Sequence, residues 1–418
     1  MLKKTWVVIL GILVVISVVG GVWYYLTQTA PKGEIVIGGV WSLTGGSAAV
    51  GEYMHRGALL AVEELNKRGG ILGRTIKYIY EDDASQPTTA ALAYDRINTQ
   101  GGAQFVIGTT FSSLALAMME PASKYKVLTL FTGAGDVKIR EMIMQNPDKY
   151  KYVWVLNPNS TVYGPLWVEF IKDYVTAGKI PPKNKIIVVI REESGWAIGA
   201  TDFLIERAKQ LLPDWEVRVE PVPLACEDFY PVLLKIKPLN PIAVIYMGYY
   251  FSSALALAKQ YFELNIPALL CYQFIAGQPE FVKTLGVERT NYVVWGNYMG
   301  MPIKDRREEF VKKYTERFGS PPSVQSAMAY DEVMLLAKAI EKAGTLNTED
   351  VVKALQTIVY EGICGRYVFN TKTHDVIPGK GYIPSLVYQF KGGESYIVWP
   401  MDYKEKEFEL PPWVKPSG

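Results

Sequence analysis

The chain has 418 residues, of which 49% are hydrophobic, and this is enough for roughly two or three domains with large cores. The 44 lysines and arginines balance 42 aspartates and glutamates, which argues against a nucleic-acid-binding protein. Its three cysteines are too few for a disulfide scaffold. Outside the cell, one bridge between Cys226 and Cys271 is possible; three unpaired core thiols, with Cys364 as the third, are the alternative.

Near the N-terminus lies an uncharged run from Thr5 to Ala30, and two lysines precede this run. At about 1.5 Å per residue, its apolar part is long enough to cross roughly 30 Å of hydrocarbon. The lysines predict that the N-terminus lies on the inner, cytoplasmic side of the membrane and that the chain after this run lies outside the cell. We therefore expect residues 1–30 to form a membrane anchor, with a cleaved signal peptide as the alternative.

Short apolar runs then alternate with amphipathic helical patterns as far as residue 295. This alternation is typical of βαβ units and of parallel sheets that helices cover on both faces. The runs are too many for one ordinary sheet, so we expect an α/β protein with two doubly wound, Rossmann-like lobes. The predicted strands are Ile35–Trp41, Ile76–Tyr80, Phe105–Gly108, Val127–Phe131, Tyr152–Leu156, Ile186–Ile190, Val217–Val222, Ile242–Met247, Ala268–Cys271 and Tyr292–Trp295.

After residue 295 the pattern becomes helical, with helices predicted over 306–318, 324–343 and 348–357, and β-like segments follow residue 371. We expect these late segments to return to both lobes. The predicted organisation is a membrane segment (1–30), a first lobe (34–157 with about 296–375), a second lobe (158–295 with about 376–400) and a C-terminal tail (401–418).

Catalytic motifs are missing from the sequence. His55 and His374 are the only histidines, and neither stands in an HExxH pattern or beside a GxSxG turn. The glycine-rich stretch at 45–51 has neither the Lys-Ser/Thr ending of a phosphate loop nor GxGxxG spacing. We therefore expect that the protein is not an enzyme and that it holds no metal and no cofactor.

Polar residues follow two of the predicted strands directly. Ser112 and Ser113 come after the strand at 105–108 and open a helical pattern, and Asp136 follows the strand at 127–131. Ligands of open α/β sheets lie beyond such strand ends, where unpaired backbone N–H groups and the helix dipole favour an anion. Helix capping alone is the alternative role for these residues.

Several segments occur in an order that a known family shares. They are Ser42-Leu43-Thr44-Gly45 with Gly51 and Gly57, the turn from Asn66 to Gly73, Asp82-Asp83, Val106-Ile107-Gly108 before the serine pair, and Ala329-Tyr330-Asp331. From residue 35 to about 388, the chain resembles the extracellular solute-binding proteins of ATP-driven (ABC) importers of the branched-chain amino acid class. The resemblance implies the type I periplasmic-binding fold, in which two lobes joined by three crossings close on a ligand and present it to a permease.

The resemblance also implies contacts to the ligand. Ser112 matches the serine that cradles the ligand carboxylate, with the backbone around Ser113 and Ala134 assisting. From the second lobe, Trp196 and Tyr249 match aromatic positions that cover the ligand.

Two positions depart from the family pattern for the ligand ammonium. Asp136 stands where a threonine is usual, and Gln273 stands where a glutamate is usual. The acidic partner of the ammonium is thus expected to have moved from the second lobe to the first.

The function that the resemblance implies is capture of a branched-chain or related apolar amino acid at the extracellular face, for import by ABC permease subunits. Without an amine partner, the ligand would instead be an amide, a urea-like solute or an aromatic carboxylate. A ligand sensor with the same fold is a second class of function. An extracellular enzyme is a third class, which the missing motifs disfavour.

Overall fold

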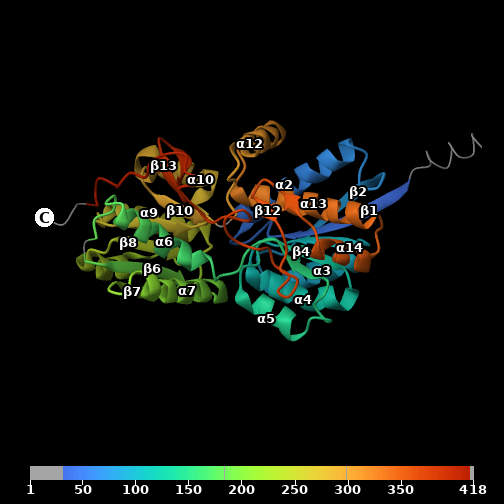
Figure 1. Cartoon of the computed structure of the whole chain (residues 1–418), viewed down its shortest axis with the longest axis horizontal. Helices are drawn as coiled ribbons and strands as arrows, with labels where there is room; N and C mark the ends of the chain where they lie inside the picture. Colours follow the sequence, from blue (N-terminus) through green and yellow to red (C-terminus); the bar gives the residue numbers. More distant parts are fainter. Residues whose placement is uncertain (1–31, 183, 298, 415–418) are drawn as a thin grey trace, which may run out of the picture.

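The computed structural model describes residues 32–182, 184–297 and 299–414, which form two lobes side by side (Figure 1). One sheet has five strands in the order β2-β1-β3-β4-β5, and the other has seven in the order β14-β13-β10-β9-β8-β6-β7. Among these described residues, no helix is both long enough and apolar enough to span a membrane. The predicted anchor at 1–30 lies outside the described residues.

The first lobe contains a parallel sheet with helices on both faces. Its strands are β1 (Lys32–Trp41), β2 (Arg74–Asp82), β3 (Phe105–Gly108), β4 (Leu128–Phe131) and β5 (Val153–Val155). Its helices are α2 (Ala48–Lys67), α3 (Pro87–Thr99), α4 (Ser112–Tyr125), α5 (Val137–Gln145), α12 (Lys304–Phe318), α13 (Val324–Ala343) and α14 (Thr348–Gln356), and β11 (Tyr360–Glu361) pairs with β12 (Arg366–Tyr367).

Alternate residues of each central strand enter different cores, as the two-residue period of a strand requires. In β3, Phe105 and Ile107 join the cluster that includes α2 and α13, whereas Val106 joins the cluster of α3, α4 and α5. Because both faces of the strand are buried, it appears in the sequence as a continuous apolar run.

The second lobe has five parallel strands and an antiparallel hairpin at one edge. Its strands are β6 (Ile186–Glu192), β7 (Glu216–Val222), β8 (Ala243–Met247), β9 (Leu269–Gln273), β10 (Val294–Asn297), β13 (Leu386–Lys391) and β14 (Glu394–Trp399). Its helices are α6 (Tyr163–Thr176), α7 (Gly195–Leu211), α8 (Tyr230–Ile236), α9 (Phe251–Glu263), α10 (Pro279–Leu285) and α11 (Val287–Thr290), with short 3-10 turns η1 (Lys237–Leu239) and η2 (Ile275–Gly277).

The chain passes between the two sheets three times: after β5, after β10 and before β13. The late helices α12 to α14 therefore lie with the first lobe, and α13 packs against α2 (Figure 1). This packing is close, because a Cβ placed on Gly57 would lie 2.0 Å from the carbonyl oxygen of Ser326. The residue boundaries given above for the lobes stay a prediction.

The turn from Asn66 to Gly73 joins α2 to β2 through backbone that glycine favours. Gly69 and Gly70 have φ values of 95° and 75°, in the left-handed region that ends many helices. The Asn66 amide then accepts from the Ile76 N–H at 2.8 Å and donates to the Ile76 carbonyl at 2.9 Å. The asparagine thus holds the start of strand β2 against the end of α2.

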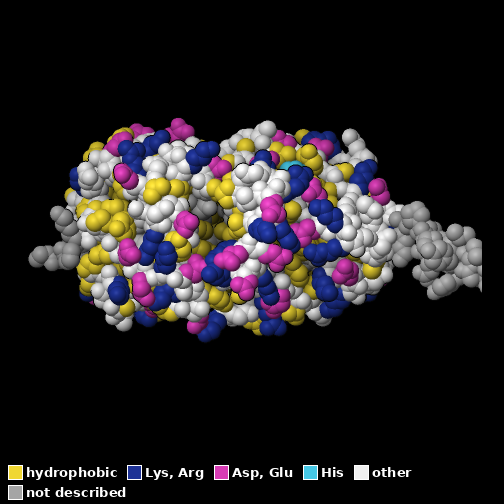
Figure 2. Space-filling model, turned by 90° about the horizontal axis from the view of Figure 1, so that it is seen from above, with side chains coloured by type: hydrophobic (Ala, Val, Ile, Leu, Met, Phe, Trp, Pro, Cys, Tyr) yellow, Lys and Arg dark blue, Asp and Glu magenta, His cyan; other side chains and the backbone are white. Residues whose placement is uncertain are grey.

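All three cysteines are buried free thiols, so the possible bridge between Cys226 and Cys271 is not formed. Cys271 lies within the buried strand β9, and burial raises the pKa of its thiol. Stability therefore comes from the two cores. On the surface, charged side chains of both signs are interspersed over the face drawn in Figure 2, as the balanced composition predicts.

Candidate ligand-binding cleft

The two lobes meet where the loops after their parallel strands face each other. In the first lobe these loops follow β1, β3 and β4, and in the second they follow β6 and β8. A Cβ on Gly46 would lie 2.5 Å from the ring of Tyr250, and the rings of Phe111 and Tyr249 are 6.2 Å apart. This junction contains most of the residues that the sequence singles out.

On the first-lobe side, Ser112 is the first residue of α4 and is only 5% exposed. Its Oγ accepts from the backbone N–H of Asp136 at 3.1 Å, so it ties the loop after β3 to the loop after β4 and makes no cap of its own helix. Ser113 is exposed, and the N–H of buried Ala134 donates to Asn157 Oδ1 at 3.1 Å.

Asp136 has two roles in its position. Its Oδ1 accepts from the N–H of Lys138 at 2.9 Å, which makes Asp136 the N-cap of α5. Its Oδ2 points toward the other lobe, since a Cβ on Gly195 would lie 2.7 Å from that oxygen. The capping role considered from the sequence is therefore confirmed, and the second oxygen is directed at the junction between the lobes.

On the second-lobe side, Trp196 lies at the start of α7 and is 2% exposed. Its ring centroid is 4.6 Å from that of Tyr249, 5.5 Å from that of Phe274 and 5.8 Å from that of Tyr163. Tyr249 is held by its backbone N–H, which donates to Glu192 Oε2 at 2.9 Å. These aromatic rings give the cleft an apolar wall.

Between the walls lies a cavity of about 30 Å³ that residues of both lobes line. A cavity of this size holds one or two water molecules and is much smaller than an amino acid. A ligand therefore enters only when the lobes move apart or the aromatic side chains rotate. The lining residues are Val50, Met54, Thr110, Gly133, Tyr249, Phe274, Ile275, Asn297, Gln325 and Met328.

Gln273, at the end of β9, is fully buried within the second lobe. Its Oε1 accepts from Trp167 Nε1 at 2.8 Å, and its Nε2 donates to the Gly296 carbonyl at 3.3 Å. Both ends of the amide thus have partners inside the lobe. A ligand contact at Gln273 stays a prediction.

Arg140 organises the first-lobe side of the cleft, although no motif in the sequence singles it out. It is 2% exposed, and its Nε lies 3.0 Å from Asp375 Oδ2. The same guanidinium donates to the carbonyls of Ala134, Asp136 and Asn157. The available signal was an arginine among the apolar residues of α5, where a buried charge needs partners.

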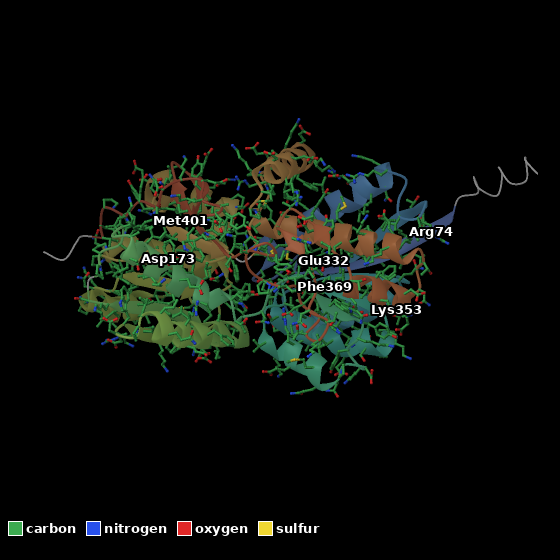
Figure 3. The ribbon with its side chains drawn as sticks, in the orientation of Figure 1. Arg74, Asp173, Glu332, Lys353, Phe369 and Met401 are labelled. Carbon is green, nitrogen blue, oxygen red and sulfur yellow. The ribbon has the colours of Figure 1, made fainter. Side chains whose placement is uncertain are left out.

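Two buried carboxyl groups behind the cleft were also missed. Glu192, at the end of β6, accepts from Tyr246 Oη at 2.6 Å and from the Tyr249 N–H, and its burial raises the pKa. Glu332, labelled on α13 in Figure 3, lies beside the Gly108 N–H at 3.4 Å, and burial raises its pKa well above the usual range. Glu192 thus supports the loop after β8, and Glu332 supports the end of β3.

Among the side-chain hydrogen bonds that cross from one lobe to the other are the following two. Tyr53 Oη on α2 donates to Glu280 Oε1 on α10 at 2.6 Å. Gln278 Nε2 donates to Gln325 Oε1 on α13 at 3.0 Å. Since the partners belong to different lobes, these bonds exist only while the lobes are close together.

A model of the periplasmic binding protein family matches residues 34–384. The chain belongs to this family. In sequence, this periplasmic binding protein is similar to the leucine-, isoleucine-, valine-, threonine-, and alanine-binding protein of Pseudomonas aeruginosa, with 23% identity over 333 residues, 79% of this chain and 84% of the relative.

Solved periplasmic binding proteins have the same fold. One is the branched-chain amino acid transporter substrate-binding protein of Streptococcus pneumoniae in complex with isoleucine, with a TM-score of 0.75, 23% identity and coverage of 88% of this chain and 100% of that one. Another is the solute-binding protein of an ABC transporter from R. palustris in complex with benzoate, with a TM-score of 0.73, 19% identity and coverage of 87% and 95%. The predicted family and the two-lobed type I periplasmic-binding fold are confirmed.

Proposed function

We propose that this protein is the extracellular substrate-binding component of an ABC importer and captures a branched-chain or related apolar amino acid between its lobes. The observation that carries the proposal is the placement of Asp136. One of its carboxylate oxygens is turned toward Gly195 of the opposite lobe, next to buried Ser112 and across from an aromatic wall. The relative from Pseudomonas aeruginosa is named for binding amino acids of this class.

Each part of an amino acid finds suitable chemistry at this junction. The N-terminus of α4, with Ser112 as its first residue, favours the ligand carboxylate through the N–H groups of Ser112 and Ser113 and the helix dipole. The Asp136 carboxylate favours the ammonium. Apolar residues such as Val50, Met54 and Ile275 line the remaining space and favour a hydrocarbon side chain.

The protein would act at the extracellular face, where residues 1–30 anchor it to the membrane, and it would deliver its ligand to ABC permease subunits. Closure of the lobes creates the surface that a permease can distinguish from the open form. The Tyr53–Glu280 bond, which joins the two lobes, would be present in the closed form alone. Binding and release, and no covalent chemistry, are the activity proposed.

An aromatic carboxylate without an amine is the second candidate ligand. The observation that favours it is the cluster of Trp196, Tyr249 and Phe274, whose flat rings suit a planar solute. A structure with this fold is known in complex with benzoate. In that case Asp136 would serve only as the cap of α5.

Titration calorimetry separates the two candidates. The full-length protein is unfolded and refolded to remove bound solute, and then titrated with leucine, isoleucine, 4-methylpentanoate, which is leucine without its amine, and benzoate. We expect the two amino acids to bind and 4-methylpentanoate to bind at least a hundredfold more weakly. Binding of benzoate and 4-methylpentanoate, without binding of leucine, would overturn the proposal and support the second candidate.

A further inference from the structure

The indole nitrogen of Trp196 is a buried donor that has no hydrogen-bond partner within the described part of the chain. The side chain is 2% exposed, so bulk water does not serve as its partner. Buried polar groups in folded proteins are almost always hydrogen-bonded, and an exception calls for an explanation.

The other buried tryptophans of the described residues show how unusual Trp196 is. Each of them donates its Nε1–H to an oxygen acceptor at 2.7 to 3.0 Å. These residues are Trp41, Trp154, Trp167, Trp295 and Trp399. Trp196, unlike these five residues, has no acceptor for its Nε1–H within the described part of the chain.

The surroundings of Trp196 place its indole beside the proposed ligand site. Its nearest ring neighbours, Tyr249 and Phe274, both line the cavity between the lobes. The preceding residue, Gly195, is the one that Asp136 Oδ2 faces. A ligand whose ammonium lies at Asp136 is therefore within the neighbourhood of this donor.

We propose that the Trp196 indole N–H donates a hydrogen bond to an acceptor in the ligand side chain. The site would then prefer an amino acid that carries a hydroxyl, ether or amide oxygen over a purely hydrocarbon one of the same shape. This inference rests on the proposed capture of an amino acid between the lobes, and it refines the ligand from a wholly hydrocarbon side chain to one of similar shape that carries one acceptor oxygen. The ligand carboxylate is a less suitable acceptor because the proposed function places it at the N-terminus of α4 in the first lobe. The Tyr249 ring separates that place from Trp196, since it lies 6.2 Å from the ring of Phe111, next to α4, and 4.6 Å from the ring of Trp196.

A pair of amino acids with equal shape tests the proposal. L-norvaline and O-methyl-L-serine differ only by the exchange of a side-chain methylene for an ether oxygen, which is an acceptor and not a donor. Both are titrated into the wild-type protein and into Trp196→Phe. We expect the preference for O-methyl-L-serine, measured as a ratio of dissociation constants, to fall by about three- to tenfold in the variant.

Trp295→Phe is the matched control. It also removes a buried indole, but the Trp295 Nε1 already donates to Ser395 Oγ at 2.9 Å within the second lobe. The ratio in this variant should equal that of the wild-type protein. A ratio that is the same in wild type and Trp196→Phe would overturn the role of Trp196, while binding of both amino acids would leave the proposed function standing.

A nitrogen-15 spectrum of the wild-type tryptophan indoles supplies a measurement that does not depend on the variant folding. O-methyl-L-serine should move the Trp196 Nε1–H signal downfield, and norvaline should not. An equal downfield shift with both would show that the acceptor is the carboxylate they share, which overturns the inference. If the wild-type protein bound leucine but neither of these two amino acids, the inference alone would be overturned; if it bound none of the amino acids, leucine and isoleucine included, the proposed function would fall with it.

Discussion

The hydrogen bond between Tyr53 and Glu280 should contribute to ligand affinity although neither residue lines the cavity. Tyr53 lies on α2 of the first lobe and is 6% exposed, and its Oη is 2.6 Å from Glu280 Oε1 of the second lobe. Tyr53→Phe removes the hydroxyl and keeps the ring. The variant therefore loses a contact that the closed form alone can make.

The size of the effect follows from the chemistry of the bond. A hydrogen bond to a charged group contributes about 1.5–3 kcal/mol net, and the half-buried Glu280 places this bond at the lower end. A loss of about 1.5 kcal/mol in the closing equilibrium is roughly tenfold. If binding requires closure, the dissociation constant for leucine should rise by about the same factor.

Calorimetry with leucine measures this change, and Tyr94→Phe is the control. Tyr94 is also buried, but its hydroxyl is 2.6 Å from Thr129 Oγ1 within the first lobe. Tyr94→Phe should lower the free energy of unfolding and leave the affinity unchanged. If Tyr53→Phe also left the affinity unchanged, the lobes would not close through this contact, and the reasoning would be refuted.

Three further outcomes are expected. Asp136→Asn keeps the cap of α5, because asparagine caps a helix as well as aspartate does. It should weaken leucine binding by hundreds-fold or more, since loss of the ion pair with the ammonium costs about 3–5 kcal/mol of binding free energy. An unchanged affinity in calorimetry would contradict the assignment of Asp136 to the ammonium. Arg140→Met should lower the free energy of unfolding, measured in urea, by about 3–5 kcal/mol, since it leaves the Asp375 carboxylate buried without its arginine. Lys353→Met is the control: Lys353 pairs with Asp350 on the surface of α14 (Figure 3), and its loss should cost less than about 1 kcal/mol. Burial raises the pKa of Asp83 from 3.8 to about 6, so the folded state favours the neutral carboxyl group and stability is lost as the pH rises from about 4 to 6. Asp83→Asn should therefore stabilise the protein by roughly 3 kcal/mol at pH 7 and by little at pH 4. Urea titrations at both pH values measure the difference, and equal effects would exclude this origin.

The fold was predictable because its strands are buried on both faces. Residues such as Val106 and Ile107 point to opposite cores, so every position in β3 must be apolar, and such a run is visible in one sequence. The edge hairpin of β13 and β14 was predicted only as a β-like region. The residues of β14 are partly exposed and the pairing of the hairpin is antiparallel, so the sequence carries a weaker pattern there.

The candidate site was predictable only where residues follow a strand end. Ser112 and Asp136 satisfy that rule, and the structure brings them within one hydrogen bond of each other. Tyr53 and Glu280 are 227 positions apart, and nothing in the sequence near either residue indicates the other. Contacts between lobes depend on how two separately folded sheets meet, which local pattern does not determine.

The position of Arg140 indicates where the molecule bends. Its guanidinium joins the loop that carries Ala134 and Asp136 to Asn157, just after β5, and to Asp375, just before the crossing to β13. Two of the three crossings are thus bound to the Arg140 guanidinium, which also binds the loop that carries Asp136, the proposed partner of the ligand ammonium. Because breaking a buried pair of this kind costs several kcal/mol, these parts should move as one body with the first lobe. We therefore expect the hinge to lie on the second-lobe side of residues 157 and 375. Opening would then move the aromatic wall of the second lobe away from Asp136, while the loops that carry Ala134 and Asp136 keep their positions in the first lobe.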